Sequence, residues 1–499
     1  MILALDIGSS SARAALYDEA GTPVPGGGKQ IEYRARVTAD GGAEHDAARL
    51  LDAAAACIDA VLPRASDLAG VGISTFWHGL LGFDGETRPV TPVYMYSDTR
   101  SAAAVDDLRR TLDDADIRAR TGCPLHTSFW PAKLRWLGQV APVVRATVAR
   151  WGSIGELLAH EWLGEGVTSV SMASATGLFD QERRAWDRAM LAAAGVDERQ
   201  LFPLSDLHQG ATLRAPWAAR WPALRDARWF PAVGDGAASN IGSGCTDRER
   251  IAINVGTSAA ARLVTDAPLA APPWGLWRYR LDARRAVAGG SLSEGGDVYA
   301  WCAETLALAE PDAVERALGA AADADHGLTV LPFLAGERST GWSGRARGAI
   351  AGLSLATTPI DILRASLESV ALRLAAIYDL LVPLAALGHE VVASGGALMR
   401  SGAWAHMIAD ALGRPLLLSR EREASSRGVA LLAAAALGRL ADFGSTVRVE
   451  GLRIESDPRR HERFRALRAR QDALYRALVG GTAGPSAAPA SLHTPELPG

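Results

Sequence analysis

A single carboxylate lies in a stretch of small residues near the middle of the chain. The run "FPAVGDGAASNIGSG" occupies residues 230–244, and Asp235 has no basic side chain within several positions. An Asp in such a place often caps a helix, because its side chain accepts hydrogen bonds from free backbone N–H groups of the first turn. The alternative is a carboxylate that a substrate must approach closely, since its neighbours are small. This stretch alone leaves both interpretations open.

A repeated pattern is the second chemical signal. "ILALDIGSSSARAALYD" (2–18) and "RIAINVGTSAAARLVTD" (250–266) run in register at an offset of 248 residues, so that Gly8 corresponds to Gly256. Each run predicts a strand, a turn of glycine and hydroxyl residues, and a second strand. Such turns suit phosphate, because glycine admits close approach while N–H groups and hydroxyls donate hydrogen bonds. The repeat indicates two related domains that face each other across a cleft, with Asp6 placed to hold a metal ion or its waters.

Elements typical of an α/β fold follow the first hairpin. Residues 49–62 predict an amphipathic helix and residues 68–75 a buried strand. The stretch "FWHGLLGFD" begins where that strand ends, at the usual ligand edge of a parallel sheet. It contains His78, although a histidine there is more often structural. "YSDTRS" places Asp98 and Arg100 two positions apart, either as a helix cap with a surface ion pair or as donors and acceptors for a polyol.

The second half of the chain shows a similar alternation. A long helix is predicted from near Pro359, and "EVVASGGALMRSGAWAHMIADALGRPLLL" (390–418) predicts a strand, a Gly-Gly turn, a helix and another strand. Gly395 and Gly396 either form a tight connection or allow an adenine ring to lie flat against the backbone. The segment after Val479 is small, polar and rich in proline, and we predict disorder there.

Bulk composition limits the classes of function. A length of 499 residues favours two domains, and a net charge of -4 offers no electrostatic footprint for nucleic acid or an anionic membrane. No apolar run reaches the ~18 residues of a membrane helix. The 4 scattered cysteines form no CxxC pair, which favours a reducing compartment. "MILALDIGSS" lacks the basic start of a signal peptide, so we expect a cytoplasmic protein.

Taken in order, these motifs resemble those of the FGGY family of carbohydrate kinases, which belongs to the ATPase superfamily of actin, hexokinase and the heat-shock chaperones. "DIGSSSAR" is similar to the family's first phosphate loop, "INVGTSAA" to the second, "SGGALMRSGAW" to the adenosine loop and "GERSTGWSGRARG" to the C-terminal signature region. The resemblance implies an α/β fold of two ribonuclease H-like (actin-like ATPase) domains flanking a catalytic cleft. Residues 1–245 would carry sugar binding, the first phosphate loop and the catalytic Asp, and residues 246–440 the second phosphate loop and the adenosine loop. Residues 441–499 would form an extension, a helix and then a disordered tail.

The resemblance also implies ATP and Mg²⁺ as cofactors and roles for individual residues. Asp235 would be the general base that takes the proton from the sugar hydroxyl, and Asp6 would help to order Mg²⁺ through water. Short sets of matching residues would contact the phosphates, the adenosine and the sugar. The phosphate set is Gly8, Ser9, Ser10, Ser11, Arg13, Gly256 and Thr257; the adenosine set is Gly395, Gly396, Ala397 and Arg400; the sugar set is Trp77, His78, Asp98, Arg100 and Asp235.

Within the family, "TGCPLHTSFWPAKLRWL", "SVSMASATGLFD" and "LPFLAGERSTGWSGRARG" are most similar to stretches of gluconate kinases. This implies phosphorylation of D-gluconate to 6-phospho-D-gluconate, with a xylulokinase-like pentulose kinase as the alternative and a non-kinase actin-like ATPase as a remote one. The gluconate carboxylate needs a cation or clustered donors, and the candidates are Arg100, His126 and Arg338. The expected partner is a small-molecule sugar or sugar acid, with no nucleic acid and no membrane; a homodimer is one option for the oligomeric state.

Overall fold

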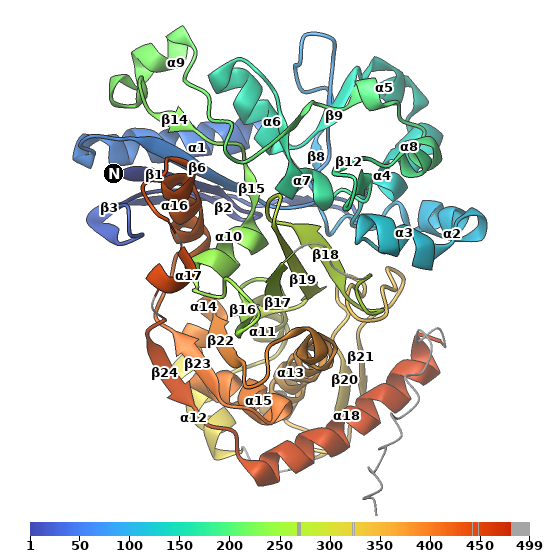
Figure 1. Cartoon of the computed structure of the whole chain (residues 1–499). Coiled ribbons are helices and arrows are strands. Elements are labelled where there is room, and N and C mark those ends of the chain that lie inside the picture. The colour runs from blue at the N-terminus through green and yellow to red at the C-terminus, as the bar shows by residue number, and fades with distance from the viewer. Residues whose placement is uncertain (267–270, 322, 324, 442, 448, 481–499) are drawn as a thin grey trace, which may run out of the picture.

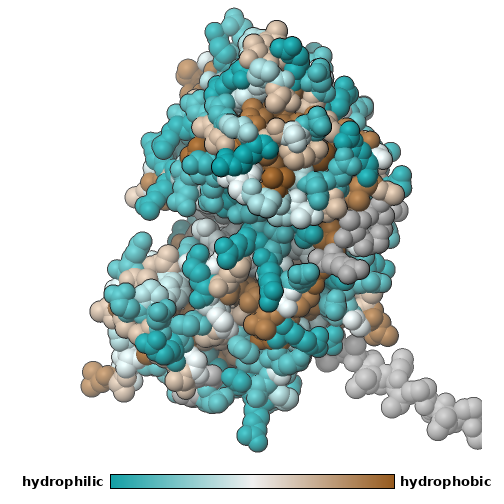
Figure 2. Space-filling view, turned by 90° about the vertical axis from the view of Figure 1, so that its left-hand side faces the viewer, coloured by the Kyte–Doolittle hydropathy of each residue, from teal (hydrophilic) through white to brown (hydrophobic). Residues whose placement is uncertain are grey.

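The computed structural model describes residues 1–266, 271–321, 323, 325–441, 443–447 and 449–480. The chain forms two lobes, each built on a β-sheet with helices packed against it, and Figure 1 shows one lobe above the other. The space-filling view shows a mainly hydrophilic surface and a narrower waist between the lobes (Figure 2). The two α/β domains predicted from the hairpin repeat are confirmed.

The sheet of the upper lobe starts with the first predicted hairpin. Its strands are β1 (Ile2–Ile7), β2 (Ser11–Tyr17), β3 (Pro23–Glu32), β6 (Gly70–Thr75), β14 (Arg228–Trp229) and β15 (Val233–Gly234). The β1 strand pairs antiparallel with β2 and parallel with β6, and β2 pairs antiparallel with β3. Short strands β14 and β15 both run parallel to β6. The end of β15 therefore lies beside the end of β6, at the same edge as the first hairpin turn.

The sheet of the lower lobe repeats this arrangement. Its strands are β16 (Arg250–Val255), β17 (Ala259–Asp266), β18 (Trp277–Arg280), β19 (Arg285–Leu292), β22 (Glu390–Ser394), β23 (Leu416–Ser419) and β24 (Gly451–Ile454). The order β19–β17–β16–β22 matches β3–β2–β1–β6 of the upper sheet, with the same parallel and antiparallel pairings. The sequence repeat thus extends from one hairpin to four strands of each sheet.

Helices cover these sheets where the strands are apolar on both faces. Helix α1 (Ala47–Val61) packs on one face of β1, against alternate residues of that strand. In the lower lobe, α13 (Pro359–Leu381) and α15 (Gly402–Leu412) pack together over the second sheet. Helix α13 begins at Pro359, as predicted, because Thr358 and Asp361 form a capping box there. Helix α18 (Pro458–Leu478) is the helix predicted for the C-terminal extension, and the predicted tail lies mostly outside the described residues.

One helix links the two halves of the sequence. Helix α16 (Ala424–Ala436) comes from the part of the chain that the sequence assigns to the second domain, yet it packs on the other face of β1 and against β6. It also lies against α10 (Asp235–Gly242), the helix that starts at the singled-out carboxylate. A Cβ atom on Gly242 would lie 1.9 Å from the carbonyl oxygen of Ala424, so the two backbones touch where only glycine fits.

Among the described residues, no helix combines the length and the apolar character that crossing a bilayer demands.

The backbone contact between α10 and α16 makes a prediction about stability. Gly242→Ala should lower the unfolding free energy by about 2–3 kcal/mol, because the added methyl group overlaps a backbone carbonyl that cannot move alone. Gly319→Ala is the matched control: Gly319 is in helix α12 (Pro311–Ala320), and its added methyl group meets nothing within 4 Å. Calorimetric melting should show a lower Tm for the first variant and an equal or higher Tm for the second. An unchanged Tm for Gly242→Ala would contradict the packing described above.

Candidate active site

Asp235 lies at the junction between β15 and α10. Gly234 occupies the N-cap position and Asp235 is the first helical residue, with its Oδ1 accepting a hydrogen bond from the N–H of Gly236 at 2.7 Å. The interpretation of Asp235 as the helix N-cap is therefore wrong by one residue, because β15 continues to Gly234. The carboxylate still lies at the positive end of a helix, where the backbone dipoles favour a negative charge.

An aromatic side chain packs so closely on the glycines around Asp235 that a larger residue would not fit there. The indole of Trp77 covers this turn so closely that a Cβ atom on Gly234 would lie 1.9 Å from it, and one on Gly236 would lie 2.5 Å from it. Trp77 is itself held by a 3.3 Å hydrogen bond from Nε1 to the carbonyl of Ser171 and by edge contacts with Trp277 and Tyr279. Trp77 therefore packs against the turn of Asp235 and holds it in place, in addition to any contact with substrate.

Two arginines surround Asp235 without forming an ion pair. Arg262 extends from β17, and its Nε would lie 2.9 Å from a Cβ atom on Gly236. Arg338 comes from the loop between β20 (Thr329–Leu331) and β21 (Ala349–Ala351). Within the described part of the chain, neither guanidinium has a carboxylate within 4.0 Å, and the buried Nε of each lacks a hydrogen-bond partner. The site therefore holds one acid and two cations that approach one another without direct pairing.

The electrostatic setting changes the acidity of Asp235. Burial raises its pKa to about 6; Arg262 acts in the opposite direction, and the charge of Asp6 adds to the increase. A carboxyl group with this pKa is ionised for most of the time at neutral pH and binds a proton more readily than an ordinary Asp. This is the acidity that suits a general base near physiological pH.

The two hairpin turns present exposed tips and fixed backbones. Ser10 in the first turn and Thr257 in the second are exposed, whereas Ser11 is buried. The carbonyl oxygens of Gly8 and Gly256 are already occupied, by the hydroxyl of Tyr33 at 2.7 Å and by the N–H of Gly296 at 2.7 Å. The carbonyl of Ser9 contacts His45 Nε2 at 2.9 Å. Fixing the carbonyls in this way orients the turns and leaves the tip hydroxyls available for phosphate.

Asp6 and Arg13 form a network beneath the first turn. The Oδ1 atom of Asp6 accepts a hydrogen bond from the Ser74 hydroxyl at 2.6 Å, and its Oδ2 accepts one from Arg13 at 3.2 Å. Arg13 also pairs with Glu423, at 3.2 Å, just before helix α16. Burial raises the pKa of the Asp6 carboxyl. Among the described residues, no group of three or more His, Cys, Asp and Glu could hold a metal ion. Mg²⁺ commonly uses one or two carboxylates, waters and substrate phosphates, so the chemistry of Asp6 fits a water-mediated contact.

The predicted adenosine residues lie beside the second hairpin. Gly395 follows β22 with a φ of 109°, and a Cβ atom there would lie 2.3 Å from the carbonyl of Val255 at the end of β16. Helix α14 (Gly396–Arg400) starts immediately after it, with Gly396 and Arg400 exposed and Ala397 buried. The tight connection is therefore real, and it places the backbone at Gly395 next to the second hairpin turn.

His78 is a neutral neighbour of Arg338. Its Nδ1 lies 2.8 Å from the carbonyl of Ala175, and its Nε2 lies 3.4 Å from Arg338 Nη2. The carbonyl requires a proton on Nδ1, and the guanidinium donates to an unprotonated Nε2. Burial, with the charge of Arg338, holds the pKa of His78 well below its usual range. The guanidinium of Arg338 also lies 5.0 Å from the centre of the Tyr96 ring.

Asp98 and Arg100 do not join this group directly. Arg100 pairs with Asp98 and, at 2.6 Å, with Glu44, while its guanidinium lies 4.7 Å from the Trp136 ring. Asp98 also accepts a hydrogen bond from the N–H of Ala43 at 3.2 Å. The pair therefore ties the segment after the first sheet to the loop at 98–100, and Arg100 has its charge balanced within the upper lobe.

Lys133 and His126 are buried, and the nitrogen atoms of their side chains have hydrogen-bond partners. Lys133 donates to the carbonyls of Thr127 at 2.8 Å and Ser128 at 2.6 Å, and burial lowers its pKa to about 7. His126 bridges the lobes, since its Nδ1 lies 3.1 Å from the Ser128 hydroxyl and its Nε2 lies 3.1 Å from the carbonyl of Glu337. Of the three cations proposed for a substrate carboxylate, Arg338 alone faces Asp235 with its charge unbalanced among the described residues.

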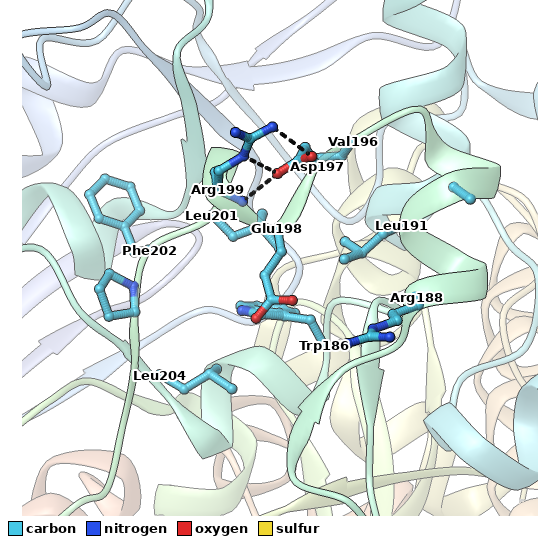
Figure 3. Close-up of a pocket in the computed structure, with 12 residues that line it drawn as sticks. Trp186, Arg188, Leu191, Val196, Asp197, Glu198, Arg199, Leu201, Phe202 and Leu204 are labelled. Atoms are coloured by element: carbon cyan, nitrogen blue, oxygen red, sulfur yellow. Dashed lines mark hydrogen bonds and ion pairs between the residues drawn. The ribbon is translucent and has the colours of Figure 1, made fainter.

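A separate hollow lies elsewhere on the upper lobe. Its volume is about 770 Å³, and its lining includes Trp186, Leu191, Glu198 and Leu204 (Figure 3). None of the residues described above lines it, and Arg199 at its rim is paired with Asp197 at 2.9 Å. The predicted site residues therefore do not belong to this hollow.

Comparison with known proteins identifies the class. The models for the N-terminal and C-terminal domains of the FGGY family of carbohydrate kinases match residues 1–242 and 251–437. The chain belongs to this family of two-domain α/β kinases.

Individual relatives differ in substrate. The chain is 25% identical to a gluconokinase of Bacillus subtilis (strain 168) over 466 residues, 89% of this chain and 88% of that protein. It is 29% identical to a glycerol kinase of Burkholderia ambifaria (strain MC40-6) over 463 residues, 88% of this chain and 89% of that protein. The structure also resembles that of a ligand-bound xylulose kinase from Lactobacillus acidophilus, with a TM-score of 0.86, 24% identity, and coverage of 96% of this chain and 98% of that one. These relatives show a carbohydrate kinase and leave the sugar open.

Sequence reasoning missed several residues of the site. Arg262 is the most informative, because it alternates with Ala261 and Leu263, which are buried in the core of the lower lobe. A charged residue within an apolar run was the available signal. Ser74 and Glu423 are ordinary polar residues in the sequence, and only the fold brings them to Asp6 and Arg13.

The charge of Arg262 near Asp235 predicts a pH effect. An ionised Asp235 is needed to accept a proton, so kcat/KM should fall as the pH drops through about 6. Arg262→Met removes a charge that lowers the pKa of Asp235, and this acidic limb should move up by roughly one pH unit. Arg262→Lys is the control that keeps the charge and should keep the limb near its wild-type position. A limb for Arg262→Met that overlays the wild-type profile, or moves to lower pH, would exclude this coupling.

Proposed function

We propose that this chain is an ATP-dependent gluconate kinase, which phosphorylates the 6-hydroxyl of D-gluconate to give 6-phospho-D-gluconate and ADP. One observation carries the choice of substrate: Arg338 is only 7% exposed and has no carboxylate within 4.0 Å among the described residues. A buried cation without a counter-ion costs free energy. The carboxylate of a sugar acid would remove that cost, whereas a neutral polyol or ketose would not.

Among the described residues, no carboxylate forms an ion pair with Arg338, and the charge of Asp235 acts on it from a distance. Burial raises the pKa of Glu294 to about 8, so this 1% exposed carboxyl group is largely protonated at neutral pH. His78 is neutral for the reason given above, and Tyr96 offers only the face of its ring. The name of the 25% identical gluconokinase supports the same substrate class. The similarity to a glycerol kinase and a xylulose kinase makes neutral sugars, including a pentulose, the alternative.

The proposed chemistry assigns one step to each part of the cleft. The two hairpin turns would hold the phosphates of ATP from opposite sides, and the backbone at Gly395–Ala397 would support the adenosine. Asp235 would accept the proton of the attacking hydroxyl while the bond from that oxygen to the γ-phosphorus forms. The bond to the bridging oxygen breaks, and ADP leaves. Phosphoryl transfer has a loose, charge-spread transition state, so positioning and electrostatic stabilisation supply most of the acceleration.

The remaining charges complete this assignment. Asp6 would help to order Mg²⁺ through water, and Mg²⁺ when bound with ATP neutralises phosphate charge. Arg262, next to Asp235, would face the oxygen atoms of the transferring group. Its second effect is to keep Asp235 ionised before the hydroxyl binds.

Replacing the carboxylate of Asp235 with an amide tests its assignment as the catalytic base. Asp235→Asn keeps the shape of the side chain but cannot accept the proton, so kcat should fall by roughly 10²–10⁴-fold. Calorimetric titration should give an ATP affinity close to that of the wild type, because Asp235 belongs to the sugar side of the cleft. A variant with near wild-type turnover would refute the base assignment.

A substrate panel with a second variant tests the choice of gluconate. An ADP-release assay across gluconate, xylulose, ribulose and glycerol should give the highest kcat/KM on gluconate. Arg338→Met should lower that value by about 30-fold or more, since truncating one partner of a buried charge pair typically costs roughly 2–5 kcal/mol. Arg345→Met is the matched control, because Arg345 lies in the same loop but pairs with Asp106 at the surface.

The panel also separates the alternatives. Strong turnover of a ketose with none of gluconate would replace the proposed substrate with a pentulose. Turnover of ATP that depends on no sugar would point instead to an actin-like ATPase.

A further inference from the structure

The loop that carries Arg338 is held from outside by the C-terminal helix. Helix α18 lies beyond residue 437, where the match to the family's C-terminal domain ends. It packs on Phe333 and Ala346 of the loop, and its Tyr475 forms a hydrogen bond with Glu337, the residue directly before Arg338. The side chain of Glu337 has no exposed surface, so every group that reaches it belongs to the protein.

Three donors hold the carboxylate of Glu337. The hydroxyl of Tyr475, on α18, donates to Oε2 at 2.7 Å, and the N–H of Gly341 donates to Oε1 at 3.0 Å. Arg373, on α13, forms an ion pair with Oε1. Arg373 also donates to the carbonyl of Ser339, at 3.3 Å. The carboxylate is therefore the point at which two helices fix the conformation of one loop.

The fit around Tyr475 is close. A Cβ atom on Gly341 would lie 2.1 Å from the Tyr475 hydroxyl, so the loop passes the tyrosine without space for a side chain. The guanidinium of Arg373 lies beside two rings, at 5.3 Å from the centre of Phe333 and 5.4 Å from that of Tyr475. Tyr475 thus contacts the carboxylate, its cation and the backbone of the turn together.

On the cleft side, the next residue makes the contacts of the site. Arg338 reaches His78 and Tyr96 in the upper lobe, as described above, while its own carbonyl accepts the N–H of Trp342 at 2.7 Å. The carbonyl of Glu337 contacts His126 at 3.1 Å. Because Glu337 and Arg338 are consecutive in a closed turn, a shift of the Glu337 side chain displaces the guanidinium on the other side.

We propose that Tyr475 is a positioning residue: through Glu337, the C-terminal helix sets the place of Arg338 and thereby the affinity for the anionic end of the substrate. The effect on substrate affinity rests on the proposed role of Arg338 in reading a carboxylate. The effect of Tyr475 on the conformation of the loop does not depend on that role.

Tyr475→Phe tests this with the full-length enzyme. The change removes one hydroxyl and keeps the ring, so Arg373 and Gly341 still hold Glu337, but less firmly. We expect KM for gluconate to rise about tenfold, with kcat and KM for ATP changed by less than about twofold. In the enzyme without ligands, hydrogen exchange should become faster in peptides that cover 337–343.

The control is a buried residue of the same helix that does not touch the loop. Gln471 donates to the carbonyls of Val330 at 2.9 Å and Ser369 at 3.4 Å. Gln471→Met should lower Tm, yet leave KM for gluconate and exchange at 337–343 as in the wild type. An equal rise in KM for both variants would show that docking of the helix, and not Tyr475, is responsible.

The two hypotheses fail in different ways. If the wild type does not phosphorylate gluconate, the proposed function falls, while the exchange measurement still tests the positioning. Unchanged exchange at 337–343 in Tyr475→Phe would overturn the positioning role whatever the substrate.

Discussion

Charges held close together without pairing are the constraint on which this structure depends. Asp235, Arg262 and Arg338 lie near one another, where burial raises the pKa of the acid and lowers the pKa of both arginines. In so poorly solvated a place, each charge interacts strongly with its neighbours. Direct pairing would occupy the carboxylate that we propose as the base and the cation that we propose for a substrate carboxylate. Trp77 packs against the turn of Asp235, and Arg262 extends from strand β17.

The duplicated sheet explains how these groups reach one place. In each lobe the central strand ends in a glycine turn, and the neighbouring parallel strand ends at the same edge. That edge carries Asp235 in the upper lobe and Gly395 in the lower one. Helix α16 joins the halves, since it comes from the end of the chain yet packs on β1, and Glu423 just before it binds Arg13. The cleft is therefore built from both ends of the sequence.

The turns proposed to bind phosphate and the residues proposed to select the sugar are held in place by different parts of the structure. Phosphate turns and the Asp235 turn are positioned by neighbouring strands within a sheet. The surroundings of Arg338 depend on contacts between lobes, such as His126 with Glu337, and on α18, which lies outside the matched family domains. The relatives that the chain matches carry the names of different kinases.

The sequence by itself determined the local elements of this protein. Hairpins, glycine turns and the start of α13 at Pro359 follow from short-range rules of strand pairing and capping, which act between residues close in the chain. The repeat at residues 2–18 and 250–266 was enough to predict two α/β domains, and the motif order pointed to the family to which the chain belongs. Asp235 could be singled out for the same reason, as a lone acid among small residues.

Only the tertiary structure decided the surroundings of that acid. The glycines beside it exist because Trp77, more than 150 residues earlier, lies on them. Asp235 has no cation near it in the sequence. In the folded chain, however, Arg262 and Arg338 approach it from the other lobe. From the sequence, Arg100 and Arg338 were equal candidates for binding a substrate carboxylate. In the structure, Arg100 pairs with Asp98 and Glu44. Whether a charge is balanced depends on distances between segments far apart in the chain, and no local pattern encodes those distances.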